Sequence, residues 1–196
     1  MNKILSNMII REVGLRLKYF YTKLKYLGKV RFNGFTVVYA FHGSSIDFRG
    51  KGTVIHSSPL SNLLGIYQRT IIVARHGGHI EIGSNCGISG ATIYAFEKIR
   101  IGEHCIIGAN VKIIDSDLHP LPVSKQLNGL NPDDVKKAPI EISDGCFIGA
   151  NSIILKGTSL GTNCIVGAGS VVHGTFPDNC IIAGNPAKII KMQNEQ

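Results

Sequence analysis

The chain has 196 residues, of which 44% are hydrophobic and 17% charged, and a formal net charge of +8. This length is enough for one domain with a sizeable core, and the composition is ordinary for a soluble protein. The positive charge does not indicate nucleic-acid binding. The basic residues gather in positions 1–31, and no basic patch with interleaved aromatic residues continues beyond them.

Residues 1–31 are predicted to form a basic amphipathic helix. They contain eight Lys or Arg residues against one acid, Glu12, and apolar residues recur at helical spacing: Leu5, Ile9, Val13, Leu17, Phe20 and Leu24. Arg11 interrupts the apolar run, so the segment is neither a signal peptide nor a transmembrane span. Two roles stay open, and one helix could fill both. It can lie on an anionic membrane surface, or it can cap the end of the fold that follows.

From Ile142 onward the chain repeats every six residues. Small residues stand four places after most members of the aliphatic series, which is Ile142, Ile148, Ile154, Leu160, Val166 and Val172. A helix repeats at 3.6 residues and a strand at 2, so neither element alone explains the spacing. A coil of three short strands per turn does. We therefore predict a parallel β-helix in which Ile142 stacks on Leu160, Ile148 on Val166, and Ile154 on Val172.

The same phase covers Ile80 to Ile114, whereas residues 32–79 contain strand-like segments in poor phase and are predicted to form irregular early coils. All five cysteines, at positions 86, 105, 146, 164 and 180, stand two residues before an inward aliphatic. Their odd number and wide spacing disfavour zinc or disulfides and favour small buried side chains. Free thiols fit a reducing, cytoplasmic location.

Residues 115–139 interrupt the repeat and are predicted to protrude as a loop. The segment contains four prolines and opens with Asp115-Ser116-Asp117-Leu118-His119-Pro120. A long excursion from so regular a fold is typical of a functional loop. The chain thus divides into a helix (1–31), a β-helix domain (32–191) with this loop, and a tail (192–196).

Several motifs in this order resemble the hexapeptide-repeat acyltransferases, in particular the sugar O-acetyltransferases related to maltose and galactoside acetyltransferases. They are the Asp-x-Asp-x-His-Pro loop entry and three further segments: 147–151 (FIGAN), 167–172 (GAGSVV) and 184–188 (GNPAK). The resemblance implies a left-handed β-helix, a homotrimer and acetyl-CoA as donor. It further implies transfer of acetyl to a sugar hydroxyl, in surface polysaccharide biosynthesis. The enzyme would be cytoplasmic, at the inner face of the cell membrane if residues 1–31 bind it.

The resemblance also implies roles for the loop residues. His119 matches the family's catalytic histidine, which takes the proton of the attacking hydroxyl. The resemblance does not supply the partner that orients His119, because Asn131 replaces the glutamate that has this role in maltose-type relatives. Asp117 is the predicted substitute, with Asp115, Asp133 and Asp134 as alternatives. Asn131 stands where maltose-type relatives carry a glutamate, and we assign it to acceptor binding together with Ser89.

The donor-binding positions follow from the same resemblance. Ala150 and Ala168 match small residues along the pantetheine arm, with an amide near Ala150 as a candidate oxyanion donor. Lys188 and Lys191 match basic residues near the CoA phosphates. His173-Gly174 departs from the Thr-Lys of many relatives, and no metal ligand is implied.

Other functions remain alternatives at this stage. N-acetylation of an amino-sugar nucleotide is possible on the same fold. A metal hydratase of the γ-carbonic anhydrase type would need three converging histidines, and the spacing of His76, His79, His104 and His119 is poor for that. A structural or ice-binding β-helix would need a flat face of repeated outward residues, and the outward residues here are irregular.

Overall fold

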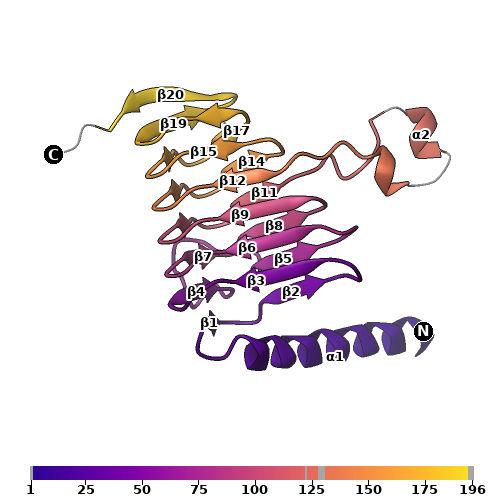
Figure 1. Ribbon diagram of the computed structural model, residues 1–196. Helices are drawn as coiled ribbons and strands as arrows, with labels where there is room; N and C mark the ends of the chain where they lie inside the picture. Colours follow the sequence, from indigo (N-terminus) through magenta and orange to yellow (C-terminus); the bar gives the residue numbers. More distant parts are fainter. Residues whose placement is uncertain (1, 122, 128–130, 194–196) are drawn as a thin grey trace.

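Short parallel strands wind into a β-helix with three faces, as the repeat predicts, and the helix is left-handed, as the resemblance implies (Figure 1). The computed structural model describes residues 2–121, 123–127 and 131–193. The chain visits the three faces in turn, so that each sheet collects every third strand. We call them sheets A, B and C, in the order in which the chain visits them.

The strands of each sheet stack in chain order. Sheet A contains β1 (Val30–Asn33), β4 (Thr53–His56), β7 (Gly87–Ser89), β10 (Ile106–Ile107), β13 (Phe147–Ile148), β16 (Ile165–Val166), β19 (Cys180–Gly184) and β20 (Ala187–Met192). Sheet B contains β2 (Val37–Ala40), β5 (Ile71–Ala74), β8 (Thr92–Ala95), β11 (Lys112–Ile114), β14 (Ile153–Leu155) and β17 (Val171–Val172). Sheet C contains β3 (Ser45–Phe48), β6 (His79–Ile82), β9 (Lys98–Ile101), β12 (Ile140–Ile142), β15 (Ser159–Leu160) and β18 (Thr175–Phe176).

The predicted stacking of the aliphatic series is confirmed. Ile142 pairs with Leu160, Ile148 with Val166, and Ile154 with Val172. All six side chains are fully buried. At least one aliphatic of each of these strands therefore faces the axis, two in β12, and their burial supplies the main stabilisation of each turn.

The small residues of the repeat bond each turn to the next. The thiol of Cys86 donates to the Gly102 carbonyl at 3.1 Å, and the Ser152 hydroxyl donates to the Gly167 carbonyl at 3.0 Å. All five cysteines are free and buried, as predicted. A small side chain with a weak donor fits here, because it satisfies a turn carbonyl without disturbing the aliphatic stack.

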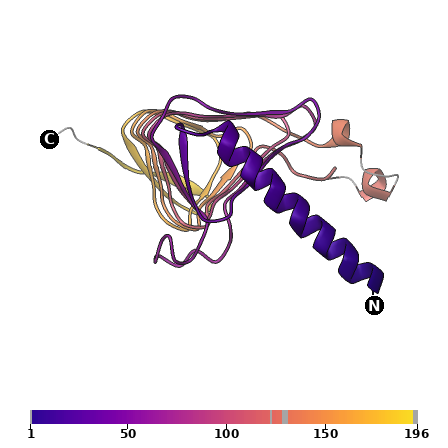
Figure 2. The ribbon, with the colours of Figure 1, turned by 90° about the horizontal axis from the view of Figure 1, so that it is seen from below.

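The helix α1 (Asn2–Lys25) closes the first end of the coil. It is shorter than the predicted 1–31, because the chain turns at Gly28 (φ +79°) and begins strand β1 at Val30. Tyr26 is part of the buried core, and its hydroxyl donates to the Ile46 carbonyl at 2.6 Å. Viewed from below, α1 crosses the end of the triangular coil and its N-terminal part extends past the outline (Figure 2). The capping role is therefore present in the structure.

The early coils are regular, which corrects the prediction of irregular structure over 32–79. Strands β2 to β6 pair in parallel with the turns that follow, and Ile46, Ile55 and Ile72 are buried like the later series. The hexad phase is hidden because the strands here are longer: β2 to β6 have four residues each, whereas β13 to β17 have two or three. One corner, residues 57–70, is a second excursion from the coil that the sequence did not indicate.

The predicted loop 115–139 leaves the coil between β11 and β12 and projects sideways (Figures 1 and 2). It carries a short helix α2 (Val123–Leu127) and a 3-10 turn, η1 (Pro132–Asp134). At the far end the chain folds back, so that β20 pairs antiparallel with β19. Residues 187–192 are therefore an edge strand that extends one residue into the predicted tail 192–196, and residues 194–196 of that tail lie outside the described residues.

Candidate active site

The base of loop 115–139 is fastened by Asp115. Its buried carboxylate accepts backbone N–H bonds from Phe96 at 2.7 Å and Glu97 at 2.8 Å, one turn earlier in the coil. Burial raises the pKa of the Asp115 carboxyl above its ordinary value, although these amides oppose the shift. Since both oxygens are engaged by the backbone, Asp115 is an anchor and is not available to orient His119.

The two strands of the loop stem are tied together just above this anchor. Asp117 donates its N–H to the Lys136 carbonyl at 2.9 Å, and Ala138 donates to the Asp115 carbonyl at 3.0 Å. The carboxylate of Asp117 forms an ion pair with Lys156, which follows β14 on the next turn. Its second oxygen, Oδ2, is buried and has no hydrogen-bond partner among the described residues.

His119 stands exposed immediately after a strained residue. Leu118 has φ +62°, and it is the one apolar side chain among the non-glycine residues with positive φ in the described part of the chain. Backbone strain of this kind persists only where the surroundings hold it, and it concentrates at functional sites. The imidazole of His119 makes no hydrogen bond to any described residue, so a substrate can reach it from solvent.

Asn131 lies further out on the loop, where it stabilises the 3-10 turn η1. Its side chain caps η1 by accepting the N–H of Asp133 at 3.1 Å. Asp134 pairs with Lys125 of α2. None of Asn131, Asp133 and Asp134 forms a hydrogen bond with His119. The role of Asn131 in acceptor binding, and that of either acid as the partner of His119, therefore stay predictions.

The predicted donor residues lie at another corner of the coil. His119 belongs to the corner between sheets B and C, here the B–C corner, whereas Ala150 and Ala168 belong to the A–B corner, where the chain leaves β13 and β16. The backbone is tight there: a Cβ on Gly149 would stand 2.5 Å from the Ala168 nitrogen. One chain therefore does not bring His119 together with Ala150.

Ser89 shares the A–B corner, but its hydroxyl is already engaged. It accepts the Asn62 side-chain amide at 3.0 Å and is largely buried. Asn62 belongs to the excursion 57–70, which also donates the Tyr67 N–H to Asn110 at 3.3 Å. The excursion therefore folds along the A–B corner towards the turn that carries Ala150. The sequence of this excursion contains no motif that would have predicted it. Its most distinctive feature in the structure is a group of exposed apolar residues, Leu60, Leu63, Leu64 and Tyr67.

The predicted phosphate-binding lysines lie on the edge strand β20. Lys188 and Lys191 are exposed and stand opposite Ala183 and Ile181 of β19. They share sheet A with β13 and β16, after which Ala150 and Ala168 follow. Among the described residues, no cluster of three or more His, Cys, Asp or Glu side chains is placed to hold a metal ion. No described helix is long and apolar enough to cross a bilayer.

Comparisons with known proteins agree with this architecture. The family described as the hexapeptide repeat of succinyl-transferase matches residues 98–114 and 139–173. Galactoside O-acetyltransferase of Escherichia coli (strain K12) is 26% identical over 87% of this chain and 82% of its own length. The enzyme of the same name from Lactococcus lactis subsp. lactis (strain IL1403) is 33% identical over 59% of this chain and 64% of its own.

A solved structure of the polySia-specific acetyltransferase NeuO is also similar, with a TM-score of 0.55, 29% identity, and coverage of 86% of this chain and 73% of that one. The match spans 60%, 55% and 49% of the length of three other curated relatives, which is between about half and three fifths of each. By these comparisons the chain is similar to hexapeptide-repeat acetyltransferases, and the family model matches its repeat segments 98–114 and 139–173.

Proposed function

We propose that this protein is an acetyl-CoA-dependent O-acetyltransferase that acts on a hydroxyl of a sugar, in surface polysaccharide biosynthesis. The observation that carries the proposal is the exposed His119, held on a strained turn whose base is clamped by Asp115 and Asp117. The activities named for the galactoside and polySia acetyltransferases support the choice of an acetyl group and of the acceptor class.

In the proposed mechanism, the acceptor hydroxyl attacks the thioester carbonyl of acetyl-CoA while His119 takes the hydroxyl proton. A tetrahedral oxyanion forms and collapses, the C–S bond breaks, and the proton passes from His119 to the departing thiolate. No covalent acyl-enzyme is formed. A backbone N–H at Ala150 is a candidate to stabilise the oxyanion.

Asp117 is proposed to position His119. A catalytic imidazole needs an acceptor on its second nitrogen to fix its tautomer and orientation. Asp117 precedes His119 by two residues, and its buried Oδ2 has no partner among the described residues. The pairing of its other oxygen with Lys156 would hold the carboxylate in place. In the proposed contact, the exposed His119 ring would turn its second nitrogen towards this oxygen.

Two copies are proposed to complete each site, in a homotrimer. His119 and Ala150 occupy different corners of one chain, so the histidine of one subunit would have to face the A–B corner of a neighbour. The outer surface of sheet B is apolar enough for such contact, with Ile114, Ile153 and Leu155 directed away from the axis and half-buried.

The direct test measures thiol release from acetyl-CoA with a panel of sugar acceptors. His119→Ala is expected to lower kcat by about 10²–10⁴-fold while acetyl-CoA still binds, as measured by calorimetry. The matched control is His42→Ala, an exposed histidine on the first turn, which should keep full activity. Wild-type rates in His119→Ala, or no binding of acetyl-CoA by the wild type, would contradict the proposal.

The composite site has its own test. His119→Ala and Ala150→Trp should each be inactive alone, since one lacks the base and the other blocks the donor corner. When the two variants are co-expressed and assemble together, some interfaces pair an intact histidine with an intact corner, and part of the activity should return. Absence of recovery in mixed assemblies, confirmed by two different affinity tags, would refute the shared site.

A further inference from the structure

The helix α1 has two faces with different surroundings. Its inner face contacts the coil: Tyr19 donates to the Gly34 carbonyl at 2.9 Å, and the Tyr26 ring packs edge-on against Phe48 at 4.8 Å between centroids. Thr22 lies between them and is buried. These contacts already close the end of the coil, so the opposite face is free for another task.

The opposite face is an apolar stripe that nothing in the described structure covers. Its members alternate in steps of four and three, which places them on one side of a helix: Val13, Leu17, Phe20, Leu24 and Leu27. Their exposed fractions are 50%, 66%, 63%, 56% and 79%. Four large apolar side chains on α1, continued by Leu27 in the turn that follows it, exceed the scattered exposure that is normal for a protein surface.

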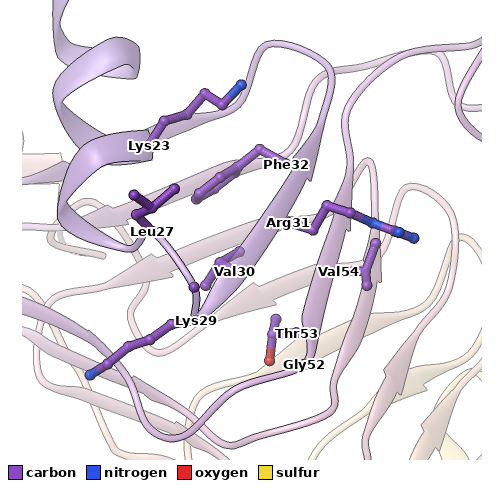
Figure 3. Close-up of a pocket in the computed structure, with 10 residues that line it drawn as sticks. Lys23, Leu27, Lys29, Val30, Arg31, Phe32, Gly52, Thr53 and Val54 are labelled. Atoms are coloured by element: carbon purple, nitrogen blue, oxygen red, sulfur yellow. The ribbon is translucent and has the colours of Figure 1, made fainter.

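Cations border this stripe and gather at its C-terminal end. There Lys23 of α1, together with Leu27, Lys29 and Arg31 beyond the helix, lines an open cavity of about 590 Å³ whose floor is formed by β1 and β4 (Figure 3). None of these three cations forms an ion pair with a described carboxylate. Glu12 is the one acid of the helix, and it pairs with Arg16.

From these observations we propose that the outer face of α1 docks the protein on an anionic phospholipid membrane. The stripe would insert at the boundary between headgroups and acyl chains, while the cavity lined by Lys23, Lys29 and Arg31 receives lipid phosphate groups. A second copy of the helix fits less well, because the cations beside one stripe would face the cations beside the other. The charge therefore favours an acidic partner, and the continuous apolar stripe favours a lipid surface.

This placement would bring the N-terminal end of the coil to the membrane and leave the loop 115–139 projecting parallel to it, to the side of the coil (Figure 1). The inference does not depend on the proposed activity, since the stripe and the cavity lie on α1, β1 and β4, away from both corners that carry the candidate site. Membrane binding and acetyl transfer can therefore succeed or fail separately.

The test is vesicle flotation with the full chain. Vesicles of phosphatidylcholine containing about a third phosphatidylglycerol are compared with phosphatidylcholine alone. The wild type should float with the anionic vesicles and be released by high salt. Replacing Leu17, Phe20 and Leu24 by serine should lower the bound fraction about tenfold, and replacing Lys23, Lys29 and Arg31 by glutamine should remove the preference for anionic lipid.

Two matched variants control for the loss of apolar groups and of charge. Leu60, Leu63 and Leu64 are three exposed leucines on the excursion 57–70, and their replacement by serine should leave binding unchanged. Lys98, Lys136 and Lys137 are exposed lysines remote from α1, and their replacement by glutamine should also leave binding unchanged. Thermal melting checks that each variant is folded.

Three results would overturn the proposal: a wild type that does not float with anionic vesicles, a triple-serine α1 variant that floats as well as the wild type, or control variants that lose binding equally. A solution mass for the wild type that doubles with concentration, and that the triple-serine α1 variant abolishes, would instead assign the stripe to a second copy.

Discussion

The anchor at Asp115 makes a sharp prediction about the loop that carries His119. In Asp115→Ala, the N–H groups of Phe96 and Glu97 lose the acceptor that now lies at 2.7 and 2.8 Å. Phe96 is buried, so water cannot replace the carboxylate at its amide, whereas the amide of the half-buried Glu97 regains part of its hydration. The substitution should therefore destabilise the protein and loosen the stem together.

The magnitude follows from the two bonds. Each hydrogen bond to a charged acceptor contributes about 1.5–3 kcal/mol, and part of this is offset by the desolvation that raises the pKa of Asp115. A net loss of about 2–4 kcal/mol is expected, which corresponds to a fall in Tm of about 5–15 °C for a chain of this size. Catalytic activity should also fall at temperatures below the melting range, because the stem of the loop that carries His119 is no longer anchored.

The assay is thermal unfolding followed by circular dichroism, with Asp144→Ala as the control. Asp144 makes the same kind of bond, accepting the Glu103 N–H at 2.8 Å, but its carboxylate is exposed. The control should therefore lose no more than about 1 kcal/mol. If Asp115→Ala melted within the same narrow range as Asp144→Ala, the carboxylate would not anchor the loop and the reasoning would be wrong.

Three further predictions concern the coil. Gly149→Ala should cost about 1–3 kcal/mol, because its Cβ meets backbone atoms of the next turn, whereas Gly87→Ala, with open space, should be neutral in the same melting assay. A thiol reagent should modify none of the five cysteines in the native protein and all of them in denaturant. Burial prevents access and raises the pKa of Cys180 to about 12, so a fast-reacting native thiol would contradict the packing. The raised pKa of Asp115 means that the folded state holds its proton more tightly, so the stability of the wild type relative to Asp115→Asn should fall as pH rises above 3.8. If denaturant titrations showed that the stability of the wild type relative to Asp115→Asn rises with pH, this prediction would be wrong.

The sequence predicted the repeat correctly because the aliphatic stack is a local pattern. Ile142, Ile148 and Ile154 recur at fixed spacing, and the geometry of three strands per turn then determines which residue lies above which. The first turns escaped this reasoning. There the distance between inward residues such as Ile46 and Ile55 differs from six, because each strand has four residues instead of the two or three of the later turns.

The candidate site was less accessible to sequence reasoning, because its contacts join distant parts of the chain. The motif singled out His119, but nothing near it in sequence indicated that Asp117 would pair with Lys156 on the next turn. The same holds for Ser89, which Asn62 engages across a loop that no motif marked. The outer stripe of α1 could be expected from its spacing, whereas the division between covered and uncovered faces required the coil against which Tyr26 packs.

The two ends of the coil differ from everything between them. Each inner turn offers its neighbours the same parallel edge, so turns are interchangeable units, and nothing within the repeat marks where it should stop. The helix α1 provides one stop, and β20, which reverses direction against β19, provides the other. A chain built in this way can gain or lose whole turns during evolution while both stops stay in place, and each corner loop is inherited together with the turn that carries it.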